Sequence, residues 1–382
     1  MADPASHLIA ARSSRGFADV VAASTALSDI DGRAGRLFYR GYDIHDLLGR
    51  VSFEECVHLL QRGTLPTQRQ LDDLHANLAA ARTLGPTVES ALDQVSATAR
   101  PMEALRTLVS VAGSDDPDKD SNRPDANQRK AVRLVAQLPV LVARYHAART
   151  GTLAPEPEPG LGIAGNLLYQ ITGKPPEPEL QAALDESLVL YADHTMNAST
   201  FAARVCAATL SDMHSAVVAA VGTLKGPLHG GAIQAVMAML ESIPNVDAVE
   251  AAVDDRLARG ERIMGFGLRA YHAQDPRARH LARISRQLSE AQGVDYYYRL
   301  SVRLQETVLE HRGLYPNVDF YAASVFHALG VPTELFPALT ASARTAGWTA
   351  HVMEQHLDNR LIRPDSEYVG ERDQKWVPIE ER

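Results

Sequence analysis

Two short segments place a titratable side chain beside residues that interrupt a helix. The first is GPLHGG (residues 226–231), in which two glycines follow His229 and would let a ligand approach the backbone closely. A helix is expected to begin here, and the positive end of a helix dipole lowers the affinity of a histidine for a proton. His229 is therefore a candidate neutral hydrogen-bond donor. A tight turn with an incidental histidine fits the same sequence.

The second segment, PNVDFY (residues 316–321), holds an aspartate among apolar neighbours. Burial of a carboxyl group raises its pKa toward the range that suits a general base. Asp319 is therefore a candidate base. It also fits the N-cap of the helix that follows, and both interpretations can hold together.

Two further segments carry polar groups at breaks in the helical pattern. In YADHTMN (residues 191–197), Asp193 and Asn197 are spaced by one helical turn and His194 lies beside Asp193. This cluster fits helix capping as well as a ligand site. In GFGLR (residues 265–269) the glycines are not spaced as in a dinucleotide-binding loop, and no strand precedes them.

Three arginines add the possibility of anion binding. Arg277 and Arg363 lie at or near the ends of elements, whereas Arg344 lies in an apolar helix between Ala343 and Trp348. A guanidinium in such surroundings is costly unless it meets an anion, because burial removes its hydration. A structural ion pair is the alternative for Arg344.

The elements expected to carry these residues are almost all helices, which predicts an all-α fold. No strand-rich block, internal repeat or βαβ alternation occurs. A small strand pair is expected within residues 20–48, leading into a helix near Asp43. Residues 114–128 are expected to form an exposed polar loop, and residues 199–221 one apolar helix in the centre of the protein or in a subunit interface. Further helices are predicted over residues 68–83, 87–99, 103–112, 130–149, 179–193, 234–240, 246–258, 277–292, 297–311 and 337–359.

Composition narrows the functional classes. The 382 residues carry 38 Lys and Arg against 47 Asp and Glu, a formal charge of −9, which argues against non-specific binding of nucleic acid. Cys56 and Cys206 lie in separate apolar runs, so neither a disulfide framework nor a cysteine metal site is expected. No apolar run approaches the roughly 20 residues of a membrane span, and the first residues lack a signal pattern. We expect a cytoplasmic protein without membrane partners.

Six segments, in order, resemble those of the citrate synthase family from about residue 20 to residue 370. They are GRLFYRGYDI, ASTFAARV, GPLHGGA, the GFG and DPRA block, NVDFY, and the C-terminal ARTAGW, EQ and RPDSEYVG. The resemblance implies a helical homodimer, each subunit with a large domain (residues 1–225 and 331–382) and a smaller inserted domain (residues 226–330). It implies Claisen condensation of an acyl-CoA with a 2-oxo acid and then thioester hydrolysis, as in citrate formation from acetyl-CoA and oxaloacetate. No metal is implied, and no cofactor besides the acyl-CoA co-substrate.

The resemblance also implies roles for individual residues. A thioester methyl is a weak carbon acid, so a base must take its proton while a donor stabilises the enolate oxygen. Asp319 matches the family's base and His229 matches its donor. The positions that bind the carboxylates of oxaloacetate match His194, Arg277, Arg344 and Arg363, the last expected to reach across from the partner subunit.

One catalytic position departs from the family pattern. The family usually has GFGH where this chain has GFGL, so Leu268 replaces a histidine that donates to the acceptor's ketone oxygen. Loss of one such donor typically costs about 10²–10³ in rate. Arg269 or His272 is a possible substitute. Other positions that differ are Tyr191, Thr195 and Ile233. Two hypotheses follow: a condensing enzyme that is impaired or takes another acceptor, and a paralogue that only binds ligand or a second subunit.

Overall fold

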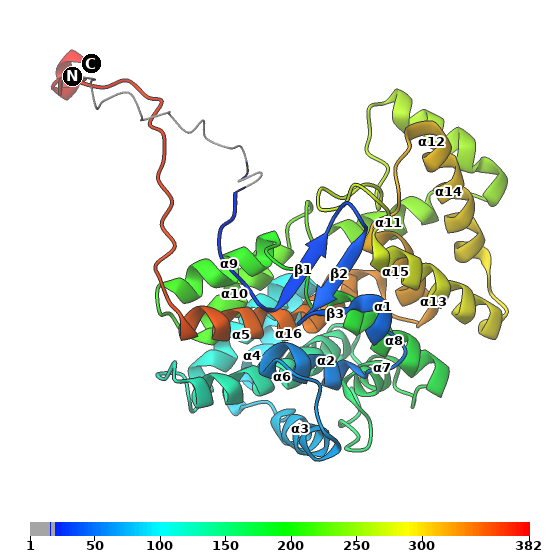
Figure 1. The fold of residues 1–382 in the computed structure, drawn as a ribbon, viewed down its shortest axis with the longest axis horizontal. Coiled ribbons are helices and arrows are strands. Elements are labelled where there is room, and N and C mark those ends of the chain that lie inside the picture. Colours follow the sequence, from blue (N-terminus) through cyan, green and yellow to red (C-terminus); the bar gives the residue numbers. More distant parts are fainter. Residues whose placement is uncertain (1–15, 17–19) are drawn as a thin grey trace.

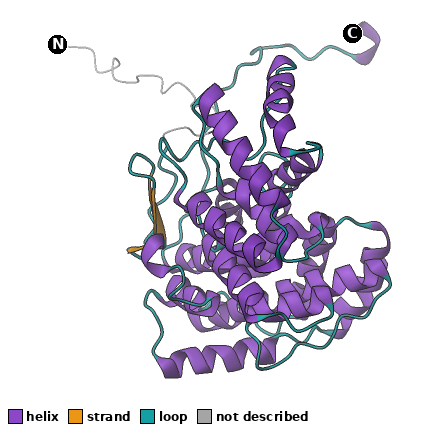
Figure 2. Ribbon diagram, turned by 90° about the vertical axis from the view of Figure 1, so that its right-hand side faces the viewer, coloured by secondary structure: helices purple, strands orange, loops and turns teal. Residues whose placement is uncertain are grey.

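The computed structural model describes residue 16 and residues 20–382. This part of the chain contains 16 α-helices and one three-stranded sheet. The helices make up the body of the molecule (Figure 1), and Figure 2 shows the small sheet at one edge of it. The predicted all-α class is confirmed.

The sheet is an antiparallel meander near the N-terminus. Strands β1 (Ser28–Asp31), β2 (Arg36–Tyr39) and β3 (Tyr42–Asp43) pair in that order. The Asp43 side chain then caps α1 (Ile44–Leu47), accepting a hydrogen bond from the backbone N–H of His45 at 2.9 Å. The expected strand pair and the helix start near Asp43 are confirmed, with the short β3 in addition.

Seven helices follow α1 before the segment that carries His194. They are α2 (Phe53–Arg62), α3 (Gln68–Ala81), α4 (Pro86–Thr98), α5 (Pro101–Asp115), α6 (Pro124–Thr150), α7 (Ile163–Thr172) and α8 (Pro178–Tyr191). Four of them, α4, α5, α6 and α8, begin with proline. Proline suits the first helical position because its missing N–H would have no partner there.

The predicted bounds of the polar loop, residues 114–128, were wrong at both ends. Helix α5 continues to Asp115. Helix α6 begins at Pro124, because proline is favoured in the first turn of a helix. The connection is also not purely a surface feature. Asp116 is buried and forms an ion pair with Arg133 at 2.7 Å.

The predicted single helix over residues 199–221 was also wrong. It is two helices, α9 (Ala198–Ala208) and α10 (Met213–Leu224), which pack on each other. Leu210 between them has a left-handed backbone with φ 64°. The Asp212 side chain caps α10 by accepting from the backbone N–H of Ser215 at 2.9 Å. One polar capping residue thus divides an otherwise apolar run.

The rest of the chain forms a second group of helices and one long central helix. The group consists of α11 (Ala232–Glu241), α12 (Val249–Ala258), α13 (Pro276–Gln292), α14 (Tyr296–Arg312) and α15 (Val318–Ala328). These helices lie together on the right of Figure 1. They belong to residues 226–330, and the division of the chain into two domains stays a prediction. Helix α16 (Phe336–Leu357) returns to the main body and is buried along most of its length.

Within α16, Gly347 lies directly against the chain that leaves α8. Its N–H donates to the carbonyl oxygen of Ala192 at 3.0 Å. A Cβ at position 347 would overlap the Asp193 carboxylate. None of the helices in the described residues is long and apolar enough to cross a membrane.

Candidate active site

Six of the seven predicted site residues line one cavity of about 620 Å³. The cavity lies between the segment after α8, the turn before α11, the loop before α13, and helices α13, α15 and α16. Both predicted domains therefore contribute to its walls. The six residues are His194, His229, Leu268, Arg277, Asp319 and Arg344.

Asp319 lies in the first turn of α15 but does not cap it. The N-cap is Asn317, whose side chain accepts from the backbone N–H of Asp319 at 3.0 Å, so the N-cap interpretation of Asp319 was wrong. The carboxylate Oδ1 accepts a hydrogen bond from the Tyr191 hydroxyl at 2.9 Å. Burial raises the pKa of Asp319 to about 6, as expected for a general base.

His229 lies in the turn that precedes α11, three residues before its first residue, Ala232. Its Nε2 is 2.9 Å from the Ser199 hydroxyl oxygen, and that oxygen accepts from the indole N–H of Trp348 at 3.2 Å. Burial and the charge of Arg344 lower the pKa of His229 to about 4. The predicted neutral imidazole is thus supported, with burial and the charge of Arg344 as its causes.

Arg344 and Arg277 reach the cavity from α16 and α13 and differ in their partners. Arg277 forms a buried ion pair with Asp275 at 2.8 Å. Arg344 donates through Nε to the carbonyl oxygen of Tyr191 at 2.6 Å and forms no ion pair with a carboxylate of the described residues. The sequence allowed a structural ion pair for Arg344, but the arginine that forms such a pair is Arg277. Burial lowers the pKa of Arg344, and a bound anion would offset this cost.

The segment that holds His194 combines the two interpretations that its sequence allowed. Asn197 caps α9, accepting from the backbone N–H groups of Ser199 and Thr200. Asp193 is buried and bonds to the Ser28 hydroxyl. His194 faces the cavity instead, with Nε2 3.2 Å from the Tyr271 hydroxyl. Burial, followed by the charges of the arginines, holds the pKa of His194 well below its usual range.

Leu268 lines the cavity with 37% of its surface exposed. Of the two possible substitutes for a donor here, Arg269 also lines the cavity, whereas His272 is exposed and outside it. Ile233 is fully buried in α11 and does not line the cavity. The apolar wall on this side therefore consists of Leu268 rather than Ile233.

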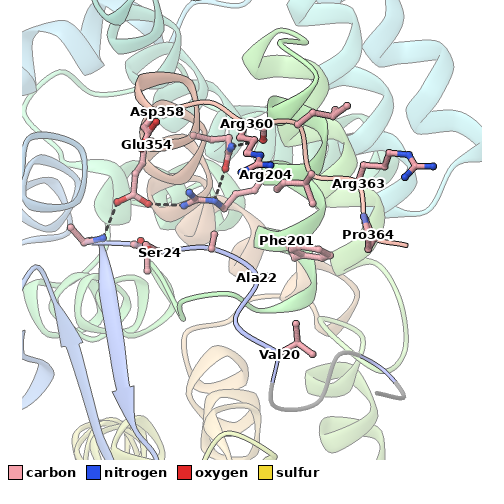
Figure 3. A pocket seen from close by; sticks show the side chains of 16 residues that line it. Val20, Ala22, Ser24, Phe201, Arg204, Glu354, Asp358, Arg360, Arg363 and Pro364 are labelled. Atoms are coloured by element: carbon pink, nitrogen blue, oxygen red, sulfur yellow. Dashed lines mark hydrogen bonds and ion pairs between the residues drawn. The ribbon is translucent and has the colours of Figure 1, made fainter. Parts of the chain in front are cut away.

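Arg363 is the predicted residue that the single chain does not bring to this cavity. It lines another cavity of about 730 Å³, formed where the residues before β1 meet the chain after α16 (Figure 3). Arg363 is exposed there and pairs with Asp365 at 3.3 Å. Within one subunit it is thus separate from the other six.

Sequence reasoning missed the contacts that hold these residues. The Tyr191 hydroxyl on Asp319, the Ser199 hydroxyl on His229 and the Tyr271 hydroxyl on His194 all join segments far apart in the chain. Tyr191 was recognised as an unusual residue, but nothing in the sequence indicated its partner. Among the described residues there is no group of three or more His, Cys, Asp or Glu side chains that could hold a metal ion.

Comparisons with known proteins agree over nearly the whole chain. Residues 16–365 match the family model described as citrate synthase, C-terminal domain. The chain is 45% identical over 369 residues to citrate synthase 2 of Bacillus subtilis, covering 96% of this chain and 99% of that protein. It is 38% identical over 362 residues to 2-methylcitrate synthase of Shewanella oneidensis, covering 94% and 96%. A solved citrate synthase of Thermoplasma acidophilum, in a ternary complex with carboxymethyl coenzyme A and oxaloacetate, matches with a TM-score of 0.91 at 32% identity, covering 96% and 99%.

Proposed function

This chain belongs to the citrate synthase family, and from that premise we propose that it condenses an acyl-CoA with a 2-oxo acid and hydrolyses the resulting thioester. The simplest case is acetyl-CoA and oxaloacetate giving citrate and CoA. The observation that carries the proposal is that a neutral histidine, a carboxylate of raised pKa and two buried arginines line one cavity.

The first chemical step needs a base and a hydrogen-bond donor on opposite sides of a thioester. Asp319 takes a proton from the methyl carbon, and His229 donates to the thioester oxygen as the enolate forms. With a pKa near 6, the carboxylate is mostly ionised at pH 7, and with a pKa near 4 the imidazole is neutral. The Ser199 hydroxyl has one proton, and its oxygen lies 2.8 Å from Oδ1 of Asn197 and 2.9 Å from Nε2 of His229. In the proposed reaction this proton is donated to Nε2, so the proton of the neutral ring is on Nδ1, which is the donor to substrate.

The second step joins the enolate carbon to the ketone carbon of the acceptor. Arg277, Arg344 and His194 would hold the acceptor's carboxylates, because buried guanidinium groups bind such anions with paired hydrogen bonds. The ketone oxygen becomes an alkoxide and needs a donor, which Leu268 cannot supply. We therefore propose that turnover is reduced or that the acceptor differs from oxaloacetate. Water then attacks the thioester and CoA leaves.

We further propose a homodimer in which Arg363 completes the partner's site. Its distance from the cavity of its own chain supports this arrangement, since the second cavity that it lines lies apart from His229 and Asp319. Mixing Arg363→Ala and Asp319→Asn proteins tests it. If Arg363 acts across the interface, each mixed dimer has one intact site, and activity returns to about one quarter of the parent when subunits exchange fully. Activity that stays at the level of the unmixed variants contradicts it.

The function itself is tested by measuring CoA release with a thiol reagent. Acetyl-CoA and propionyl-CoA are each combined with oxaloacetate, pyruvate and longer 2-oxo acids. We expect release with at least one pair, dependent on Asp319. No release with any pair would overturn the proposal.

Leu268 also supports a second candidate, a paralogue that binds ligand or another subunit without turnover. Binding to the folded state raises the melting temperature whether or not reaction follows. Oxaloacetate that raises the melting temperature, with no CoA release from any pair, would favour this candidate. The retained buried arginines are consistent with either function.

A further inference from the structure

Tyr191 lies between the two halves of the proposed site. It is the last residue of α8 and is almost fully buried. Its hydroxyl donates to Oδ1 of Asp319 at 2.9 Å, while its carbonyl oxygen accepts from Nε of Arg344 at 2.6 Å. Its ring packs on Phe326 of α15, with the centroids 6.2 Å apart. One residue thus contacts both the candidate base and an anion-binding arginine.

The contact with Asp319 leaves the carboxylate free to react. Only one of its two oxygens is engaged by the phenol, and within the described residues no other side chain hydrogen-bonds to the carboxylate. A carboxylate held at one oxygen keeps a fixed orientation, and the second oxygen can face a carbon acid in the cavity. A base must lie within hydrogen-bond distance of the proton that it removes, so its orientation matters.

The two hydrogen bonds of Tyr191 join three parts of the chain, which the sequence assigns to two domains. Tyr191 belongs to the first part of the predicted large domain, Asp319 to the small domain, and Arg344 to the C-terminal part of the large domain. The hydroxyl bond therefore crosses the predicted boundary between domains. It would be made or broken if the two move relative to each other.

Resting on the proposed function, we propose that Tyr191 is a positioning residue that orients the Asp319 carboxylate and keeps it in register with Arg344. It does not touch the reacting atoms in this role. Tyr191 acts through the Asp319 carboxylate. It fixes the position of this base relative to Arg344, which would bind the acceptor.

Electrostatics adds a measurable signature to this geometry. The groups that act on the Asp319 carboxyl are Tyr191 on α8, Asp275 and Arg277 at the start of α13, and Arg344 on α16. Burial raises its pKa, whereas the Tyr191 bond and the two arginines lower it. The pKa of Tyr191 itself is raised well above its usual value by burial, so the phenol remains a donor. Removing the hydroxyl should therefore raise the pKa of Asp319.

The test is Tyr191→Phe, which keeps the ring and the backbone carbonyl. We expect the acidic limb of the kcat/KM profile to move up by about one pH unit, so the ionised fraction of Asp319 at pH 6 falls from about one half to about one tenth. The KM for the 2-oxo acid should change less than about twofold, because the carbonyl still holds Arg344. The matched control is Tyr321→Phe on α15, which removes a hydroxyl bonded to Gln305 and should leave the profile unchanged.

A purely structural role predicts a different result. It would lower activity at every pH without moving the acidic limb, and this outcome would overturn the proposal. An equal change in the Tyr321→Phe control would also overturn it. Replacing Tyr191 by 3-fluorotyrosine gives a test in the other direction. The stronger phenol donor should move the limb to lower pH, and no movement counts against the proposal.

A second readout separates this proposal from the proposed function. The protein can be labelled with ¹³C at aspartate carboxyl carbons, and the Asp319 resonance identified by its absence in Asp319→Asn. Its titration should shift upward in Tyr191→Phe even if no acyl-CoA and 2-oxo acid pair reacts. Absence of turnover in the parent would then overturn the function alone, whereas an unchanged titration would overturn the role of Tyr191.

Discussion

The enolate-forming and acceptor-binding halves of the cavity are built on different principles. In the proposed reaction Asp319 takes a proton and His229 shares one. Each of the two is partly buried and has one hydroxyl partner, Tyr191 for Asp319 and Ser199 for His229. Burial disfavours the charged form of each group, so it raises the pKa of Asp319 to about 6 and lowers the pKa of His229 to about 4. At pH 7 this leaves one ionised base and one uncharged donor. The half that would do proton chemistry is complete within one chain.

The proposed acceptor half consists of fixed charge, and in the proposed dimer it is incomplete within one chain. Arg277 and Arg344 are buried and permanently charged, and His194 is held neutral beside them. Leu268 offers no donor, and Arg363 lies at another cavity. The comparison shows that the groups proposed for proton transfer and the groups proposed for anion binding are separate sets of side chains. Substitutions in each half should therefore affect different kinetic constants.

The largest effect is expected from removing the base. Asp319→Asn keeps the shape and the acceptor for Tyr191 but cannot take a proton, so kcat should fall by about 10²–10⁴. The rise in melting temperature with oxaloacetate should remain, because the arginines are unchanged. Asp254→Asn, an exposed position on α12, is the control. A loss of less than tenfold would show that Asp319 is not the base.

The next effect is a gain in the acceptor half. Leu268→His supplies a donor at the cavity, and kcat with oxaloacetate should rise by about 10²–10³ if the missing donor limits turnover. Leu314→His, at an exposed residue that does not line the cavity, controls for a general effect of added histidine. Unchanged turnover would indicate that oxaloacetate is not the acceptor or that other positions also limit the reaction.

Removing one acceptor cation should affect binding more than turnover. Arg344→Met loses hydrogen bonds to a charged ligand worth about 1.5–3 kcal/mol, so KM for the 2-oxo acid should rise about tenfold to a hundredfold. KM for the acyl-CoA should change little. The control is Arg283→Met, a partly exposed residue paired with Glu186 outside the cavity. A KM that rises equally for both substrates would contradict the division of the site.

The smallest effect concerns stability and pH. The folded-state pKa of Asp319, about 6, exceeds its ordinary value of 3.8, so its contribution to stability is intact below about pH 4 and lost as the pH rises through 6. Asp319→Asn should exceed the parent's free energy of unfolding by about 1–3 kcal/mol at pH 8 and match it near pH 4. Denaturant unfolding at a fixed protein concentration measures this. Equal stability at both pH values would show that burial does not raise this pKa.

Much of the fold and of the site could be predicted from the sequence because both depend on local signals. Periodicity located most helices, and glycine or proline breaks located His229 and Asp319. The errors arose where one capping residue outweighed the pattern. Asp212 divided an apolar run, and Pro124 started a helix inside a polar stretch. Both effects are local, but they compete with a stronger average over many residues.

The contacts between segments could not be predicted in the same way. Tyr191 reaches Asp319 only because α8 and α15 lie side by side, which is a property of the whole packed molecule. The different partners of Arg277 and Arg344 follow from their positions beside Asp275 and the end of α8. The sequence identified the charged groups, whereas their hydrogen-bond partners required the fold.

Gly347 has a consequence for which substitutions this protein can accept. Glycine inside a helix costs roughly 0.5–1 kcal/mol relative to alanine, so an alanine in α16 would ordinarily stabilise the chain. Here it would collide with Asp193, next to His194. Replacement of glycine by alanine, which would otherwise stabilise a helix, is therefore disfavoured at position 347. The close contact between the segment of His194 and α16 therefore requires glycine at position 347.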